Sequence, residues 1–154
     1  MQVVSGNKAS SSKKPVGAPK GVTLLFLRHG ESTANTKGVL AGRTAGVHLT
    51  AKGRDQIISI AQDFLDLKID LALSSSLDRA MESASLFLAT RNLDFFIEDG
   101  FIEMDYGKFN GKKLKILAMK PQWKVIKKNP QNFAFSDGEG FLDALNRVGK
   151  AINK

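Results

Sequence analysis

The sequence of 154 residues has no cysteine, two histidines, one tryptophan and one tyrosine. Without cysteine there is no disulfide framework, no thiolate metal site and no thiol nucleophile, and two histidines are too few for a histidine-rich metal site. No apolar run approaches the ~20 residues that cross a bilayer, and the N-terminal region lacks the apolar core of a secretory signal. We therefore expect a cytoplasmic protein with no metal or other cofactor and no membrane partner.

Positive charge is in excess, with 23 Lys and Arg against 15 Asp and Glu and a net charge of +8. Half of this excess lies in residues 1–21, which are rich in Ser, Pro and Gly and contain no acidic residue. Because such a segment has almost nothing to bury, we predict a disordered basic tail over residues 1–21. Its lysines lack interleaved aromatic residues, so we expect no nucleic-acid partner. A nucleic-acid binder driven by the tail is kept as an alternative.

The remainder of the chain, residues 22–154, alternates short apolar runs with amphipathic segments. Strands are predicted at residues 22–27, 69–73 and 93–97. Helices are predicted at residues 51–67, 77–91 and from the capping-box pattern at 136–139 to the end. This alternation favours one α/β domain, a three-layer α/β/α sandwich with a mostly parallel sheet.

Two of the predicted strand ends carry side chains that suit an anion. Arg28 and His29 follow the first strand, and residues 74–76 follow the second, with Arg79 in the first turn of the next helix. Ligands of such sheets lie beyond the carboxyl ends of the strands, and a guanidinium matches the oxygens of a phosphate. A neutral imidazole between two arginines is a competent nucleophile toward phosphorus. The pattern favours a phosphate pocket, although each residue alone also fits a structural role.

Five segments in order along the chain strengthen this interpretation, because they resemble the motifs of the histidine phosphatase superfamily, the phosphoglycerate mutase-like family. The resemblance runs from Val22 to Ile152. Ser83 stands where the family usually has Thr, and Gly140 where it has Ser. The segments are residues 27–32 (LRHGES) with Asn35, 39–50 (VLAGRTAGVHLT) with Lys52 and Gly53, 75–84 (SSLDRAMESA), 103–111 (EMDYGKFNG), and 137–140 (DGEG) with Arg147.

The resemblance implies a phosphoglycerate mutase-like fold and catalysis through a phosphohistidine without a metal. His29 would be the nucleophile. Glu103 would protonate the leaving oxygen and then deprotonate the attacking water. The phosphate-binding residues would be Arg28, Arg79, Asn35 and Ser32.

One element of the family's pattern is missing from the sequence. The family places a second catalytic histidine in a Ser-His-Gly segment after a late apolar strand, well beyond the position of Arg147. This chain ends at Lys154, and its other histidine, His48, lies in the wrong place in the order of motifs. We therefore expect a domain that is incomplete at its C-terminus, in a fragment of a longer protein or a truncated gene product.

The sequence thus favours a phosphomonoester hydrolase, a histidine acid or broad-specificity phosphatase that acts on a small phosphorylated metabolite. A phosphoglycerate mutase-type phosphotransferase is an alternative. The family's mutases tend to carry Gly-Trp where this chain has Ala41-Gly42-Arg43, which favours the hydrolase. A catalytically impaired fragment that only binds a phospholigand is the other alternative. The sequence indicates neither the substrate nor the oligomeric state.

Overall fold

The computed structural model describes residues 21–154, so the predicted basic tail lies outside the described residues except for Gly21. Helices dominate the described part of the chain. The helices are α1 (Thr33–Thr36), α2 (Ala51–Asp63), α3 (Asp78–Leu88), α4 (Leu114–Leu117), α5 (Pro121–Lys128) and α6 (Phe141–Ile152). The strands are β1 (Leu73–Ser74) and β2 (Phe96–Ile97), and the short 3₁₀ helices are η1 (Asp99–Phe101), η2 (Gly107–Phe109) and η3 (Pro130–Asn132).

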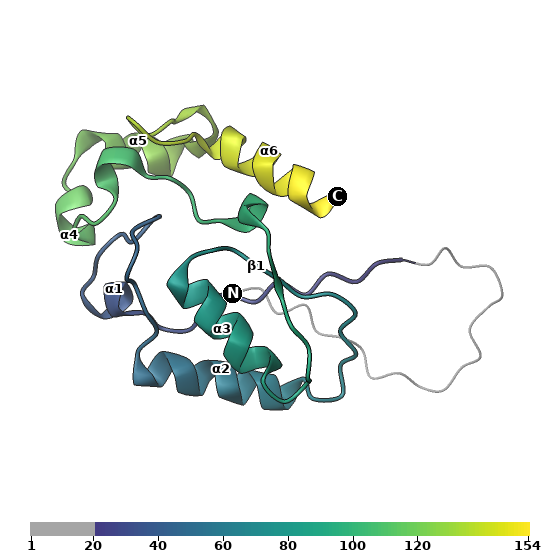
Figure 1. Ribbon diagram of the computed structural model, residues 1–154. Coiled ribbons are helices and arrows are strands. Elements are labelled where there is room, and N and C mark those ends of the chain that lie inside the picture. Colours follow the sequence, from purple (N-terminus) through teal and green to yellow (C-terminus); the bar gives the residue numbers. More distant parts are fainter. Residues whose placement is uncertain (1–20) are drawn as a thin grey trace.

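The two strands form a parallel pair, in which Leu73 lies opposite Phe96 and Ser74 opposite Ile97. Helix α3 connects them, which is the crossover that a parallel pair requires. In Figure 1, α2 and α3 lie on one side of β1, and α5 and α6 lie on the other. The α/β class and the parallel pairing predicted from the sequence are confirmed.

The prediction of a first strand at residues 22–27 is wrong, since these residues form no strand in the described structure. Their side chains are exposed, with Val22 at 86% and Phe26 at 67%, instead of buried on both faces. Phe26 makes an edge contact with Phe101 of η1, at 6.4 Å between ring centroids. An apolar run indicates a tendency to be buried, but a strand also needs a hydrogen-bonded neighbour. Here the paired strands are two residues long.

The helix ends also differ from the prediction. Helix α2 ends at Asp63 and not at residue 67, and α3 covers residues 78–88 of the expected 77–91. Helix α6 begins at Phe141, because Asp137 adopts a positive φ of 58° and turns the chain before the helix. Its cap is Gly140, whose N–H donates to the Asp143 carboxylate at 2.9 Å.

The core lies between α2 and α3. Ile57 and Ala61 of α2 pack with Phe87 and Leu88 of α3 and with Leu49, and all five side chains are at most 5% exposed. The spacing of four residues between Ile57 and Ala61 places them on one face of α2. This packing fixes α3, and with it the first turn that carries Arg79.

Two glycines let the chain after residue 29 lie against the start of α2. A Cβ on Gly30 would be 2.2 Å from the Gly53 carbonyl oxygen, and a Cβ on Gly53 would be 2.0 Å from the carbonyl oxygen of Glu31. Real side-chain carbons never approach backbone so closely, so both positions require glycine. The contact sets the place of His29.

Candidate active site

His29 is half-buried and is held by its neighbours on both sides of the ring. Its Nδ1 lies 2.7 Å from the carbonyl oxygen of Gly30. Because a carbonyl only accepts, the hydrogen bond assigns the ring proton to Nδ1 and leaves a lone pair on Nε2. The peptide N–H of Gly30 in turn donates to Ser83 Oγ at 3.3 Å, and this hydroxyl donates to the Arg79 carbonyl at 2.7 Å. Helix α3 therefore fixes the histidine through Ser83.

The guanidinium of Arg79 faces the unprotonated ring nitrogen of His29, Nε2. Its Nε donates to His29 Nε2 at 3.2 Å, and its Nη2 donates to the Gly42 carbonyl at 2.9 Å. Arg79 is 3% exposed, yet its Nη1 has no hydrogen-bond partner within residues 21–154. A buried donor without an acceptor costs free energy. An anion oxygen beside His29 would satisfy this donor.

Burial and charge determine the protonation state of His29. Burial is the main cause that lowers the pKa of His29, and the positive charges of Arg79 and Arg28 lower it further. The hydrogen bond to Gly30 and the charge of Glu103 oppose this shift. The imidazole is therefore neutral near pH 7, as a nitrogen nucleophile must be.

Glu103 lies close enough to His29 and Arg79 for its charge to affect the pKa of both. Its Oε1 accepts hydrogen bonds from the Met104 N–H at 2.8 Å and from the Tyr106 hydroxyl at 3.2 Å. Burial raises the pKa of the Tyr106 phenol, and the charge of Glu103 raises it further. The phenol therefore stays protonated and donates a hydrogen bond to the carboxylate. The charge of Glu103 acts on both His29 and Arg79. The structure thus brings together an imidazole, a guanidinium and a carboxyl group.

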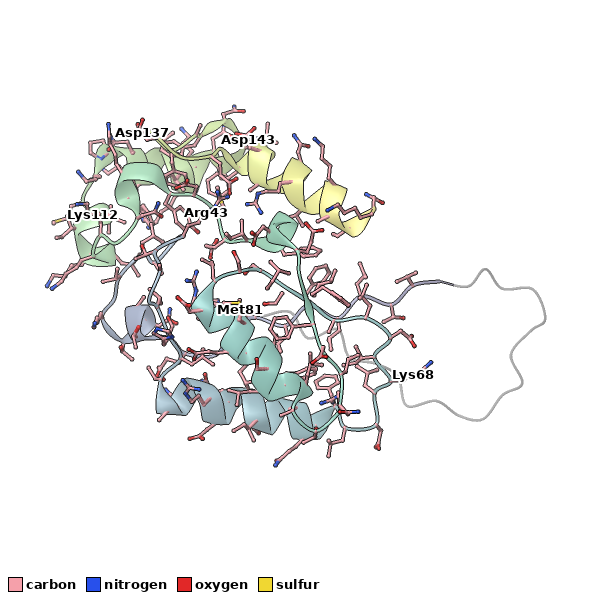
Figure 2. The ribbon with its side chains drawn as sticks, in the orientation of Figure 1. Arg43, Lys68, Met81, Lys112, Asp137 and Asp143 are labelled. Carbon is pink, nitrogen blue, oxygen red and sulfur yellow. The ribbon has the colours of Figure 1, made fainter. Side chains whose placement is uncertain are left out.

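Glu139 holds the segment that carries Glu103. Its Oε1 accepts from Arg147 Nη2 at 2.6 Å, from Arg43 Nη2 at 3.1 Å and from the Asp105 N–H at 3.1 Å. Arg43 Nε donates to the Glu103 carbonyl at 2.9 Å, and Arg147 Nη1 donates to the carbonyls of Gly100 and Ile102, both at 2.9 Å. Arg43 lies beneath the upper group of helices in Figure 2. Two arginines and one carboxylate therefore clamp residues 100–105.

The other predicted phosphate ligands are placed differently. Ser32 and Asn35 cap α1 together: Asn35 Oδ1 accepts from the Ser32 N–H at 2.9 Å and from its hydroxyl at 2.8 Å. Ser32 is 1% exposed, so its hydroxyl is committed to the cap. Arg28 is exposed and reaches the site through its charge on His29. Phosphate binding by these three residues stays a prediction.

His48 does not lie with His29 in these contacts. Its Nδ1 is 2.6 Å from Glu82 Oε1, and the other Glu82 oxygen accepts from Arg54 and from the Leu49 N–H, both at 3.0 Å. This pairing ties the loop before α2 to α3. Within residues 21–154 no group of three or more His, Asp and Glu residues could hold a metal ion.

Sequence reasoning missed the roles of Ser83, Glu139 and Tyr106. Ser83 and Glu139 lie inside segments that resemble the family's motifs, and that resemblance was the available signal. Tyr106 lies in another such segment, residues 103–111, and its spacing of three residues from Glu103 also suits a hydrogen bond between the two side chains. None of the helices in the described part of the chain is long and apolar enough to cross a membrane.

Comparison with known proteins identifies the family of the chain. The profile of the histidine phosphatase superfamily (branch 1) matches residues 24–154. Phosphoserine phosphatase 1 of Hydrogenobacter thermophilus is 29% identical over 129 residues, which are 82% of this chain and 61% of that protein. A 2,3-bisphosphoglycerate-dependent phosphoglycerate mutase of Thermoplasma acidophilum is 33% identical over 89 residues, 58% of this chain and 44% of that protein.

Among solved structures, a putative alpha-ribazole-5'-P phosphatase of Escherichia coli superposes with a TM-score of 0.74 at 29% identity, and the match covers 82% of this chain and 63% of that one. The chain thus spans about half to two thirds of the length of these relatives. His29, Arg79 and Glu103 all lie within the matched range, residues 24–154. The chain belongs to the histidine phosphatase superfamily, branch 1.

Proposed function

We propose that this chain carries the phosphoryl-transfer site of a phosphomonoester hydrolase that acts on a small phosphorylated metabolite. The observation that carries the proposal is the contact of 3.2 Å between Arg79 Nε and His29 Nε2, beside the buried and unpartnered Arg79 Nη1. A guanidinium in this place can hold phosphoryl oxygens in line with the imidazole nitrogen.

In the first step, Arg79 Nε transfers its hydrogen bond from His29 Nε2 to a phosphoryl oxygen. The freed lone pair of Nε2 attacks phosphorus, and the ester P–O bond breaks as the P–N bond forms. Glu103, in its protonated form, gives its proton to the leaving alcohol oxygen. Arg79 and Arg28 offset the negative charge on the phosphoryl oxygens in the transition state. The Tyr106 hydroxyl, 3.2 Å from Glu103 Oε1, keeps the carboxyl group oriented.

In the second step, the Glu103 carboxylate takes a proton from water as the water oxygen attacks phosphorus and the P–N bond breaks. Inorganic phosphate leaves, and both His29 and Glu103 return to their starting protonation states. A mutase would replace water with a second metabolite, and the relative from Thermoplasma acidophilum keeps this alternative open.

The test is turnover of a panel of phosphomonoesters by the full chain and by its H29A variant, with acid-labile phosphate on the protein measured by phosphorus NMR. The proposal expects phosphate release with water as the acceptor, an acid-labile phosphohistidine, and loss of both in H29A. Binding of vanadate without turnover would favour a fragment that only binds a phospholigand. Phosphate transfer to a second metabolite at the expense of hydrolysis would favour the mutase.

A further inference from the structure

The segment from Tyr106 to Ser136 has an unusual charge. It contains eight lysines and neither an acidic residue nor an arginine, whereas the rest of the described chain has more acidic than basic residues. All eight lysine side chains are exposed. They are Lys108, Lys112, Lys113, Lys115, Lys120, Lys124, Lys127 and Lys128.

Seven of these lysines are not neutralised by the protein. Lys108 forms an ion pair with Asp137 at 3.0 Å, but the other seven form no ion pair with any residue in the described range. Lysines elsewhere do pair, as Lys68 does with Asp70 at 2.8 Å and Lys154 with Glu98 at 2.7 Å. Uncompensated charge on one segment creates a positive potential that attracts anionic partners.

The seven lysines without an ion pair lie in and beside helices α4 and α5. Lys115 is in α4, three are in α5 (Lys124, Lys127 and Lys128), and the others flank the two helices (Lys112, Lys113 and Lys120). The two helices are neighbours at the upper left of Figure 1, and Lys112 lies at the outer edge of the same region in Figure 2. Leu117 of α4 is 0% exposed and anchors this region to the protein. We call the exposed side chains of residues 112–128 the basic face.

Apolar side chains lie among the lysines of the basic face. Met119 is 76% exposed, Val125 53% and Ile116 47%. On α5 the half-buried residues Trp123 and Ile126 face the protein, so Val125 is exposed on the same side as the lysines. Lysines combined with exposed apolar side chains are typical of segments that lie at the interface of an anionic membrane.

The aromatic residues near the basic face do not provide a platform for nucleic acid. Phe135 is 5% exposed and packs against Phe133, Phe109 and Tyr106, at 5.0, 5.6 and 5.1 Å between ring centroids. These rings are therefore engaged within the protein and not free to stack on bases. The absence of arginine from residues 106–136 also removes the side chain best suited to a nucleic-acid phosphate.

We propose that the basic face binds the surface of a membrane rich in anionic lipid headgroups. The unpaired lysines supply the attraction, and Met119 and Val125 enter the headgroup region. The contact is peripheral and involves no membrane-spanning segment, and it departs from the sequence-based expectation of no membrane partner. It stands independently of the phosphatase proposal, because none of its residues is assigned to the catalytic site.

The test is flotation of the full chain with phosphatidylcholine vesicles that contain or lack phosphatidylserine, with the fluorescence of the single tryptophan, Trp123, as a second readout. Binding is expected only with phosphatidylserine. Each neutralised lysine near the surface should weaken binding about fivefold, so a triple variant K124Q/K127Q/K128Q should lose about a hundredfold. A matched triple variant of paired lysines, K52Q/K68Q/K154Q, loses the same net charge and should bind almost normally.

Three outcomes would overturn the proposal. Equal loss in both triple variants would mean that net charge alone drives binding, and loss only after neutralising the lysines of residues 1–21 would assign binding to the tail. The variant M119S/V125S keeps every charge and should weaken vesicle binding while leaving binding to heparin unchanged. Binding to single-stranded RNA that exceeds vesicle binding and is insensitive to M119S/V125S would assign the basic face to nucleic acid instead.

Discussion

Arg79 and His29, which are fifty residues apart in the sequence, meet through a hydrogen bond of 3.2 Å between Nε of the guanidinium and Nε2 of the imidazole. The same guanidinium has one buried nitrogen without a partner within the described residues. Burial is the main cause that lowers the pKa of His29, and the charge of Arg79 adds to this effect while its guanidinium presents a free donor beside Nε2. A neutral imidazole and a free donor are both requirements of phosphoryl transfer to histidine.

The first prediction concerns pH. Because burial and the two arginines lower the pKa of His29 below its ordinary value of 6.5, the ring stays neutral and reactive at mildly acidic pH. The rate of phosphohistidine formation should fall only when the pH drops below that lowered pKa. An NMR titration of the His29 ring, assigned with an H48Q variant, measures the pKa directly. The R79Q variant should raise the pKa of His29, since the positive charge of Arg79 then no longer adds to the effect of burial.

The same shift has a consequence for stability. The unfolded chain binds a proton at His29 near pH 6.5, while the folded chain binds it only at lower pH. The contribution of His29 to stability is therefore complete above pH 6.5 and is lost as the pH falls from there through the folded pKa. Urea unfolding at a series of pH values should show a smaller pH dependence in H29Q than in the parent chain over that window.

The second prediction concerns the clamp around Glu103. In E139Q the clamp loses the charge that holds Arg43 and Arg147, at 3.1 and 2.6 Å, so the Glu103 carboxyl group should move from its working position. Hydrolysis of alkyl phosphates, which need a proton on the leaving oxygen, should slow about 10- to 100-fold. Dinitrophenyl phosphate needs no such proton and should be hydrolysed at nearly the parental rate.

A matched control for the clamp is D137N. Asp137 lies two residues away and pairs with Lys108 on the surface, and asparagine tolerates its positive φ of 58°. Its kinetics should match those of the parent chain for both substrates. If E139Q slowed both substrates equally, Glu139 would be a structural residue and not a positioning residue for the acid.

The third prediction concerns Ser83. In S83A the buried N–H of Gly30 loses the hydroxyl that accepts its hydrogen bond at 3.3 Å. Because the side chain is 3% exposed, water does not replace it easily, and the free energy of unfolding should fall by about 1–3 kcal/mol. The S83T variant keeps the hydroxyl and should stay within about 0.5 kcal/mol of the parent chain. Urea denaturation measures both, and equal losses in the two variants would contradict the assigned hydrogen bond.

How far the sequence predicts this molecule depends on whether a feature is local. The segments around α2 and α3 were predictable because their apolar residues repeat with the period of a helix, and the parallel pairing followed from the alternation of elements. The proximity of His29 and Arg79 was predicted from the rule that strand ends and helix starts meet at one edge of a sheet, although residues 22–27 form no strand in the described structure. Their catalytic roles stay a prediction.

Features that depend on a partner were not predictable. Residues 22–27 have the composition of a buried strand, but the sequence alone does not specify which segment would pair with them. Ser32 and Asn35 have the spacing of three residues that suits mutual capping, and this local use competes with binding a ligand. The charge of the basic face was not predicted, because the net charge of residues 22–154 averages the lysines after Tyr106 with the acidic excess of the other residues.

The last prediction compares three glycine-to-alanine substitutions, of which two should destabilise the protein and one should stabilise it. A Cβ on Gly30 would lie 2.2 Å from the Gly53 carbonyl oxygen, and one on Gly53 would lie 2.0 Å from that of Glu31, whereas a Cβ on Gly149 in α6 would meet nothing within 4 Å. G30A and G53A must push backbone apart and should each lose about 2 kcal/mol or more. G149A removes a helical glycine in open space and should gain about 1 kcal/mol.

Thermal unfolding of the three variants tests the interlock of the His29 loop with α2. Because G30A and G53A remove the same backbone contact from its two sides, the double variant should lose less than the sum of the two single losses. Strict additivity would mean that the two glycines act independently. A stable G30A with unchanged phosphohistidine formation would show that the approach of the His29 loop to α2 does not set the position of the nucleophile.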